Sequence, residues 1–344
     1  MFNSSHTHTA PIIRKNLIET FALDAEQRRR TEDYGRELTA KLVTVVGAAL
    51  GDLQPANLSF GNGSAGFAMN RRLPTPKGYI NSAHPAGPTD HDVPVLKITT
   101  QDGKIRAILF GYACHNTTLT SEFYQYSGDY AGFAQIDLER DNPGSTALFL
   151  LLCAGDQNPY PRSKLEYAQK HGADLAAEVG RVLSASMKPV RGKILAAFQT
   201  VDLPFAIHTR ETFEARLNDP SQSRARHAKA MLETYDRREP IRSYPSYPVQ
   251  AVAFGKDLTL IALGGEPVVD YALRVKKEYG AKGIIVAGYS NDVMSYIPSL
   301  RVLKEGGYEA ADSMISYGLP GPYTDDVEDR VFSTIRQVMK RVKR

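Results

Sequence analysis

Four apolar runs of this chain end directly in polar residues that can bind a metal or carry a proton. Each run is short, rich in Val, Ile and Leu, and followed by a turn, which is typical of a buried β-strand. Ligands of open α/β sheets bind beyond the carboxyl ends of strands, where loops converge on a rigid base. The residues after these runs are therefore candidate site residues: His115 after "AILFGYAC", Asp156 and Asn158 after "ALFLLLCAG", Glu266 after "LTLIALGG", and Asn291, Asp292 and Tyr296 after "GIIVAG".

These strand-like runs alternate with helical patterns. In the helical segments apolar residues recur three and four positions apart, the period of an amphipathic helix. The alternation predicts an α/β fold, with a mixed β-sheet core flanked by helices and the active site at the strand carboxyl ends. We expect residues 1–344 to form a single domain in which residues 73–90, dotted with Pro and Gly, make a long loop. The predicted helices cover residues 24–50, 128–140, 163–187, 212–238, a stretch from 267 onward, and 324–344.

Two histidines stand close to the start of the chain, in the stretch "SSHTHTAP". No apolar run follows His6 or His8 that would make them part of a core. Together with His115 and Glu266, His6 would complete a set of two histidines and a carboxylate. Catalytic zinc sites use such a set and keep one position open for water. The required spacing is spatial rather than sequential, so no short metal-binding motif has to be present.

Other classes of protein are disfavoured by composition and motif. The net charge of +4 is small, and no basic stripe with interleaved aromatics indicates nucleic-acid binding. The chain has no apolar stretch of about 18 residues that could span a membrane and no signal-peptide pattern at its start. Cys114 and Cys153 end apolar runs, which indicates buried free thiols. The remaining histidines (His84, His91, His171, His208 and His227) belong to no constellation, and we expect them on the surface.

Several segments resemble motifs of the neutral ceramidases, zinc-dependent amidases that cleave the N-acyl bond of ceramide. "SHTHTAP" is similar to that family's T-H-T-H-S-G-P, and "FAMNRR" resembles its N-R-S segment. "CHNTT" followed by "SGDYAGFA" is similar to H-P-T followed by S-G-D-x-x-G-x-A. "GGEP" falls where the family has P-G-E, and "SNDVMSYIPSLRVLKEGGYEAA" matches S-N-x-Y-x-x-Y followed by Y-E-A-A.

The resemblance implies a role for each matched residue. His6, His115, Glu266 and Tyr296 would bind Zn²⁺, and His8 would lie beside them as an acid/base group. Arg71 and Tyr308 would line the active site and act in catalysis, while Asp156 and Asn158 would bind the substrate. The chain would then be a zinc-dependent hydrolase of lipid-like N-acyl amides, with no nucleic-acid partner. Members of the family are often secreted or periplasmic.

The sequence also departs from the family pattern. The segment that precedes the two-histidine motif and the C-terminal immunoglobulin-like domain are absent, so we expect an N-terminally shortened catalytic domain. The family loop G-D-x-S-P-N reads "GDQNPY", which puts Asn158 where a serine would bind the ceramide head group. Asparagine differs from serine in reach and donor geometry. A non-ceramide amide or ester is therefore an alternative substrate.

Two further readings stay open at this stage. Aspartates in "SGD" and "AGD" would suit a two-metal phosphoesterase, although the D-x-H and asparagine-histidine patterns of that chemistry are missing. A catalytically retired homologue would keep the fold without the activity. Retention of every proposed zinc ligand weighs against it. The "GNGSAG" match to a dinucleotide motif is rejected, because strand-like rather than helical residues follow it.

Overall fold

A computed structural model gives the fold of residues 1–13, 21–237 and 242–343, in which the strands form two main mixed sheets. The first sheet has the order β6 (Thr146–Leu151), β5 (Ile105–Tyr112), β4 (Asp92–Thr99), β1 (Asn57–Ser64) and β8 (Lys188–Val190). The second has the order β13 (Ile284–Ala287), β11 (Leu258–Leu263), β10 (Ser243–Phe254) and β9 (Ile194–Pro204). Only β5 with β6 and β11 with β13 are parallel pairs within these two sheets.

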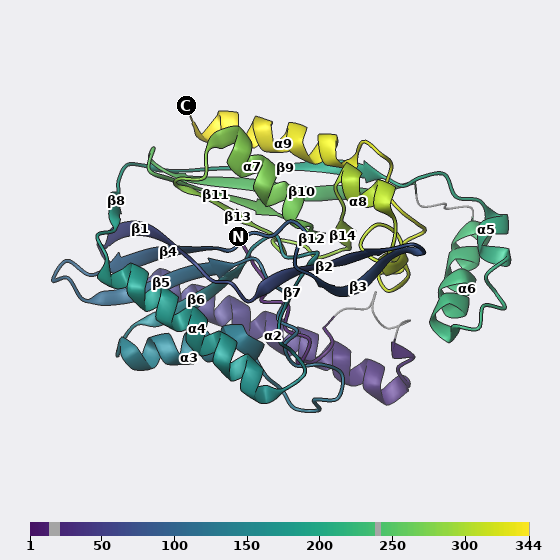
Figure 1. Cartoon of the computed structure of the whole chain (residues 1–344), viewed down its shortest axis with the longest axis horizontal. Helices are drawn as coiled ribbons and strands as arrows, with labels where there is room; N and C mark the ends of the chain where they lie inside the picture. Colours follow the sequence, from purple (N-terminus) through teal and green to yellow (C-terminus); the bar gives the residue numbers. More distant parts are fainter. Residues whose placement is uncertain (14–20, 238–241, 344) are drawn as a thin grey trace.

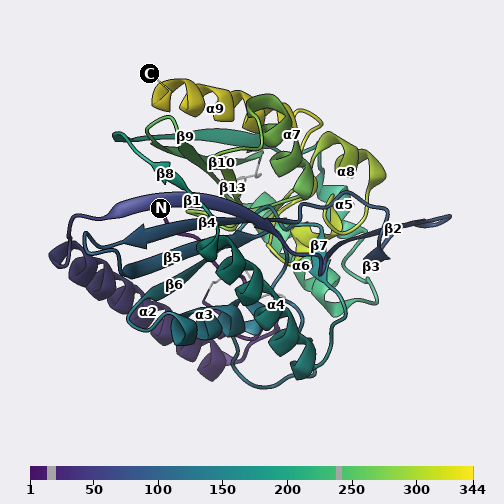
Figure 2. The ribbon, with the colours of Figure 1, turned by 60° about the vertical axis from the view of Figure 1, so that its left-hand side comes forward.

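The two sheets pack face to face, with helices on both outer faces (Figure 1). Side chains of both sheets form one apolar cluster between them, including Phe60, Leu150, Leu260 and Ile285. α3 (Asp129–Asp141) and α4 (Leu165–Ser184) cover the first sheet, and α7 (Val269–Tyr279) and α9 (Val327–Val342) cover the second, as Figure 2 shows from the side. α3 connects β5 to β6 and α7 connects β11 to β13, because parallel strands need a crossover. The predicted α/β class with a mixed-sheet core is confirmed, and that core is divided between two sheets.

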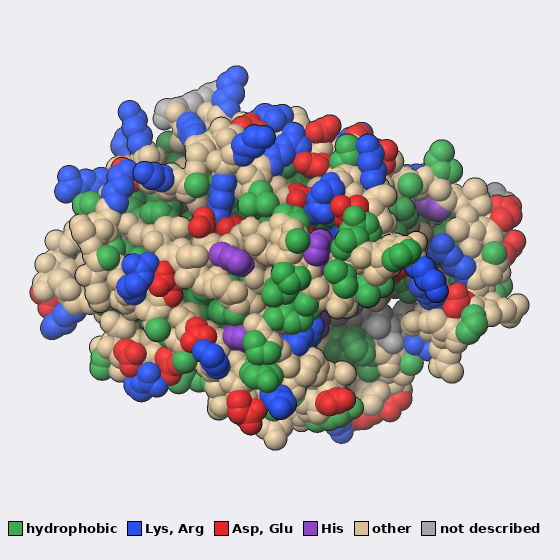
Figure 3. All heavy atoms as spheres, in the orientation of Figure 1, with side chains coloured by type: hydrophobic (Ala, Val, Ile, Leu, Met, Phe, Trp, Pro, Cys, Tyr) green, Lys and Arg blue, Asp and Glu red, His purple; other side chains and the backbone are tan. Residues whose placement is uncertain are grey.

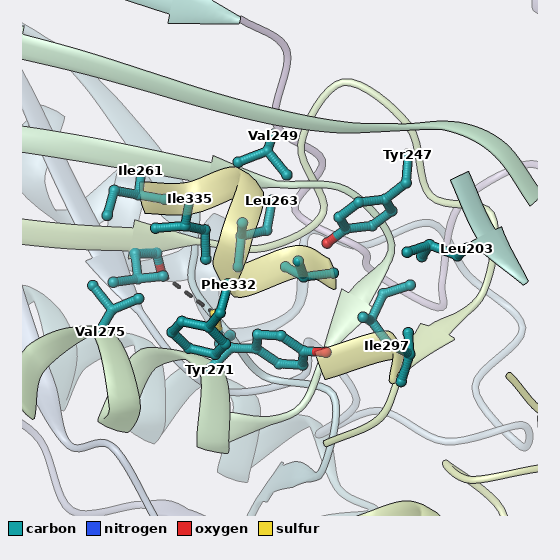
Figure 4. Close-up of a cluster of buried hydrophobic side chains, with 14 of the residues drawn as sticks. Leu203, Tyr247, Val249, Ile261, Leu263, Tyr271, Val275, Ile297, Phe332 and Ile335 are labelled. Atoms are coloured by element: carbon teal, nitrogen blue, oxygen red, sulfur yellow. Dashed lines mark hydrogen bonds between the residues drawn. The ribbon is translucent and has the colours of Figure 1, made fainter. Parts of the chain in front are cut away.

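The core beneath α7 and α9 is closely packed (Figure 4). Phe332 of α9 stacks on Tyr271 of α7, with ring centroids 5.6 Å apart and planes 2° from parallel. Val249, Ile261 and Leu263 of the sheet lie against them, and all five side chains are buried. Burying an aromatic side chain of this size stabilises the fold by roughly 1.5–3 kcal/mol. This packing holds β11 and β13 rigidly behind the loops that follow them.

A β-hairpin replaces part of the long loop predicted at residues 73–90. β2 (Ala68–Thr75) and β3 (Gly78–His84) pair antiparallel, and β2 also pairs with β7 (Gln157–Pro159). Gly78 turns the hairpin at a φ of +108°, a backbone conformation that favours glycine. β3 has no buried residue, so its sequence lacks the apolar alternation by which a strand is recognised.

The helical region predicted at residues 212–238 is two helices, α5 (Arg210–Glu214) and α6 (Gln222–Asp236). Pro220 lies between them, and proline disfavours helical conformation in the residue before it. The end of that prediction, residues 238–241, lies outside the described residues. The predicted helix at 24–50 is confirmed as α2 (Ala25–Gly51), of which every residue is at least partly exposed. Shorter elements complete the described chain: β12 (Glu266–Pro267), β14 (Tyr296–Ile297), α8 (Leu300–Glu305) and the 3₁₀ helix η2 (Asp312–Ile315).

Three histidines expected on the surface are buried: His171, His208 and His227. His171 donates through Nε2 to the Pro161 carbonyl at 2.7 Å, and His227 does so to the Leu319 carbonyl at 2.8 Å. These bonds satisfy one ring nitrogen of each imidazole, which lowers the free-energy cost of burying the neutral ring. Cys114 and Cys153 are buried free thiols, as predicted.

Charged side chains of both signs are spread over the face shown in Figure 3, and Lys and Arg are most numerous along its upper edge. That edge includes the C-terminal end of α9, where Lys340 and Arg341 occupy the last turn. Glu328 and Asp329 occupy its first turn, so the charges complement the helix dipole at both ends. Among the described residues, no helix is long and apolar enough to cross a membrane.

Candidate metal centre

The first residues of the chain are anchored between the ends of the two sheets. The Asn3 side chain donates to the carbonyls of Leu151 (3.2 Å) and Gly288 (2.8 Å) and accepts from the Leu151 amide (2.9 Å). The Ser4 amide donates to the Tyr289 carbonyl at 3.1 Å. These contacts join residues near the start of the chain to the ends of β6 and β13.

A second set of contacts fixes the other side of this N-terminal segment, defined here as residues 3–9. The Thr7 and Thr9 hydroxyls donate to the Ser127 carbonyl at 2.8 Å, and the Ser127 amide donates to the Thr9 carbonyl at 3.1 Å. The His8 amide donates to the Asn116 carbonyl at 3.4 Å. His6 therefore lies between two anchored stretches, with a φ of +57°, an unusual backbone conformation for a residue other than glycine.

His6, His8 and His115 form a histidine cluster. One ring nitrogen of each lies within 4.8 Å of the others, and the Nε2 atoms of His6 and His8 are 3.2 Å apart. Part of the His8 side chain reaches solvent, whereas His115 is fully buried beyond the end of β5. Desolvation of the ring and the neighbouring imidazoles lower the pKa of His8. Neutral imidazole is the form that binds metal ions.

Glu266 brings a carboxylate into the histidine cluster from the start of β12, the short strand that follows β11. Its Oε2 lies 3.2 Å from Nε2 of His6 and 3.1 Å from Nε2 of His115. The Tyr289 hydroxyl donates to the same oxygen at 3.2 Å, and the Tyr317 hydroxyl donates to Oε1. Burial acts to raise the pKa of Glu266, but the neighbouring His6 and His115 hold it well below its ordinary value.

The hydrogen bonds of His115 define which of its nitrogens is free. Nδ1 lies 2.7 Å from the Ala154 carbonyl and 3.2 Å from the Gln157 carbonyl. Carbonyl oxygens only accept, so Nδ1 carries the proton and Nε2 presents a lone pair toward Glu266 and the Tyr296 hydroxyl, 3.2 Å away. Burial and the Arg71 charge lower the pKa of His115 to about 4, which keeps the ring neutral.

This donor set fits a cation. An Nε2 lone pair and a carboxylate oxygen 3.1 Å apart are both acceptors and have no proton between them. A divalent ion that binds nitrogen and oxygen would relieve this repulsion, and His Nε2 atoms with a carboxylate are ligands that zinc prefers. The structure thus brings together His6, His115, Glu266 and Tyr296, and places His8 beside His6.

Arg71 and Tyr308 lie on the side of Tyr296. The Arg71 guanidinium donates to the Tyr296 hydroxyl at 3.0 Å and to Oδ1 of Asn158 at 3.2 Å. The Tyr308 ring stands 5.4 Å from the Tyr296 ring, centroid to centroid, and 40% of the residue is exposed. Tyr308 therefore reaches the surface next to a buried arginine.

The two predicted substrate-binding residues differ in their surroundings. Asn158 contacts Arg71, and its Nδ2 donates to Oδ1 of Asn81 at 3.4 Å. Asp156 instead accepts from the Val269 amide (2.7 Å) and from Nδ2 of Asn70 (2.9 Å), which ties the start of α7 to β2. Burial raises the pKa of Asp156 to about 6. Both of its oxygens are thus engaged by protein groups.

Three residues of this site were missed by the sequence analysis: Tyr289, Tyr317 and Glu309. Tyr289 directly follows "GIIVAG", so the strand-end rule that selected Tyr296 would also have found it. Tyr317 and Glu309 lie in irregular chain after α8, where no periodicity marks them. Asn291 and Asp292, which the rule did select, contact Gln250 and Tyr244 instead.

Two solved structures are similar to this chain. The crystal structure of a neutral ceramidase from Pseudomonas aeruginosa matches with a TM-score of 0.64 at 18% sequence identity, covering 90% of this chain and 55% of that one. A ceramidase complexed with C2 matches with a TM-score of 0.66 at 16% identity, covering 99% of this chain and 61% of that one. This chain therefore spans less than two thirds of either neighbour. No protein-family model and none of the curated protein sequences matches it. The likeness shows a shared fold, as the motif resemblance implied.

Proposed function

We propose that this chain is a zinc-dependent hydrolase that cleaves an N-acyl amide bond, in the manner of a ceramidase. The observation that carries the proposal is the convergence of His6 and His115 on one oxygen of Glu266, at 3.2 and 3.1 Å. These residues come from the N-terminal segment and from the ends of two different sheets. Packing alone does not require three such groups to meet.

His6, His115, Glu266 and Tyr296 would hold the metal. When bound, zinc supplies Lewis acidity for an amide carbonyl and for a water molecule whose pKa falls to about 7. The buried bonds of His115 Nδ1 orient its ring, and the Tyr289 and Tyr317 hydroxyls orient the Glu266 carboxylate. Such outer hydrogen bonds fix the direction of ligands and tune their basicity.

The remaining site residues would act on the substrate. Arg71 is a fixed positive donor, and Tyr308 offers a hydroxyl at the surface beside it, so both suit the negative oxygen that develops in amide hydrolysis. His8 has a neutral imidazole at the solvent side of the cluster, so it would accept the proton that the attacking water loses and pass that proton to the leaving amine. Asn158 would contact the polar end of the substrate beside Arg71.

Asn158 favours a substrate other than ceramide as a second candidate. Its Oδ1 is already engaged by Arg71, and its Nδ2 faces Asn81, so its free donor geometry differs from that of a serine hydroxyl. An N-acyl amide or ester with a different polar head is therefore included in the proposal.

The test combines elemental analysis with an amidase assay. We expect about one zinc per purified chain, lost in the His115→Ala and Glu266→Ala variants, and hydrolysis of an N-acyl amide panel that includes ceramide. Absence of zinc after incubation with the metal would contradict the metal centre. Zinc binding without hydrolysis of any amide or ester in the panel would contradict the activity and favour a retired enzyme.

A further inference from the structure

Two consecutive arginines of β2 share one buried carboxylate. Successive residues of a strand point to opposite faces, yet Arg71 and Arg72 both donate to Glu309. Nε of Arg71 lies 2.7 Å from Oε1, and Nη1 of Arg72 lies 2.6 Å from Oε2. The pairing of β2 with β3 shifts register between Asn70 and Arg72, and the Glu309 side chain binds one arginine with each oxygen.

The other partners of the two arginines separate their surroundings. Arg71 also donates to Tyr296 and Asn158, within the candidate metal centre. Arg72 donates to Glu305 and to the Gly306 carbonyl, and it lines a cavity of about 460 Å³ that the hairpin and α8 enclose. Arg71 therefore lies within the candidate metal centre, and Arg72 lies among the residues that support it.

The chain between α8 and Glu309 folds around Arg72. Gly306 and Gly307 have φ values of +71° and +82°, which turn the chain sharply after α8. Tyr308 follows this turn directly, so the contact between Glu309 and the arginines also sets where the Tyr308 ring stands. That ring lies beside Tyr296, within 5.8 Å of the Arg71 guanidinium.

Burial makes this arrangement sensitive to loss of the carboxylate. Arg71, Arg72 and Glu309 are all at most 4% exposed. Among the described residues, Glu309 is the one carboxylate bonded to Arg71, whereas Arg72 also pairs with Glu305. Removing one member of a buried ion pair leaves an uncompensated charge that shifts toward other partners or solvent. Without Glu309, Arg71 would keep only the neutral acceptors Tyr296 and Asn158.

We propose that Glu309 is a positioning residue, which holds Arg71 against Tyr296 and Asn158 through one oxygen and fixes the Tyr308 turn through Arg72 with the other. This inference rests on the proposed function, in which Arg71 and Tyr308 contact the substrate. Glu309 itself touches neither substrate nor metal. Its effect passes through two side chains that do.

The experiment compares Glu309→Gln with Glu305→Gln, a matched control that removes a carboxylate from Arg72 and leaves Arg71 untouched. In zinc-loaded protein we expect Glu309→Gln to lower kcat on an N-octanoyl amide by about tenfold to a hundredfold, with KM changed by less than about threefold. Glu305→Gln stays within about threefold of the wild type. Combined with Arg71→Ala, the Glu309→Gln change lowers kcat by a smaller factor than it does alone, because its effect through Arg71 is already lost and only its effect through Tyr308 remains.

A crystal structure of the Glu309→Gln variant tests the positioning without reference to activity. An Arg71 guanidinium that has left Tyr296 supports the proposal, and one that keeps its bonds to Tyr296 and Asn158 overturns it. If Glu309→Gln does not fold, Glu309→Asp replaces it, since the shorter side chain keeps the charge and loses the reach to bridge both arginines. A wild type that hydrolyses no amide contradicts the proposed function alone, and the crystal structure still decides the role of Glu309.

Discussion

The Nε2 atom of His6 lies 3.2 Å from Oε2 of Glu266, which links the N-terminal segment to β12. Glu266 is 1% exposed and His6 is partly exposed, so the carboxylate lies deeper in the site than the His6 imidazole. The position of His6 depends on the contacts that hold the N-terminal segment, residues 3–9. The affinity of the site for metal is therefore coupled to how firmly that segment is held.

Asn3→Ala tests this coupling without changing a proposed ligand. The Asn3 side chain makes bonds to Leu151, Gly288 and Ser290, and losing them leaves buried backbone groups without partners, at about 1–3 kcal/mol each. We expect faster amide hydrogen exchange across residues 3–9 and zinc affinity weakened by about tenfold or more. Gln54→Ala, an exposed change beyond α2, should alter neither. Unchanged exchange in Asn3→Ala would show that the threonine contacts to Ser127 hold the segment unaided.

Tyr317→Phe should weaken metal binding, whereas Tyr308→Phe should lower turnover and leave metal binding unchanged. The Tyr317 hydroxyl donates to Glu266, so its removal should weaken zinc binding by about 10–100-fold, the range for lost outer hydrogen bonds. Tyr308 touches Tyr296 only through its ring, so Tyr308→Phe should keep zinc and lose turnover. Chelator competition measures the first effect and an amidase assay of zinc-saturated protein the second. Equal zinc affinities in both variants would refute the distinction.

The site residues that follow strands could be predicted from the sequence, because an apolar run directly before a polar residue is a local pattern. His115 and Glu266 each follow an apolar run, and the packing rules of α/β folds place such residues together. His6 follows no strand, so it was joined to this set by residue type, as the second histidine of a zinc ligand set, and by its resemblance to a motif. Tyr317 and Glu309 come from chain outside the regular elements, so no periodicity marks them; Glu309 stands in the matched Y-E-A-A motif, but its bonds to Arg71 and Arg72 join residues distant in the sequence.

Burial of the lone histidines could have been predicted in part. His171 lies three residues after Ala168 and four before Leu175, on the same buried face of α4, so the helical period places it in the core. The bond from His227 to Leu319 joins residues distant in the sequence, which no periodicity reveals. Strand β3 was missed because none of its residues is buried, so its sequence shows no apolar alternation.

His227 should make the protein less stable in mild acid. Burial holds the pKa of His227 below the ordinary value of about 6.5, and Nδ1 has no hydrogen-bond partner among the described residues. The unfolded chain therefore binds more protons than the folded one as the pH falls below about 6.5, and the free energy of unfolding decreases. His227→Gln cannot titrate in this range and retains a donor for Leu319. We expect Tm to fall less between pH 7.5 and 5.5 in this variant than in the wild type.

His171, whose pKa burial also lowers, should contribute in the same direction, so the variant that replaces both histidines should show the weakest dependence of Tm on pH. If Tm depended on pH in both variants as it does in the wild type, the two buried histidines would not be the cause of the acid sensitivity.

Phe332→Ala should destabilise the fold severely while leaving the metal ligands in place. Phe332 is fully buried and stacks on Tyr271 (Figure 4). The Arg274 guanidinium lies over the Phe332 ring, 3.9 Å from its centroid. Truncation of a buried Phe removes its apolar contacts and leaves a cavity, at a cost of about 3–5 kcal/mol. Leu273→Ala is the control, since Leu273 lies on α7 and is 36% exposed. This change should lower the free energy of unfolding by less than about 1 kcal/mol. Urea unfolding of zinc-free protein measures both. The Phe332→Ala variant has a second use, because α7 begins beside Asp156 and follows Glu266 closely. If Phe332→Ala lowers zinc affinity in proportion to stability, the metal centre and the α7–α9 core unfold as one unit. If zinc affinity is unchanged at temperatures where the variant is still folded, the strand ends hold the ligands independently of that core.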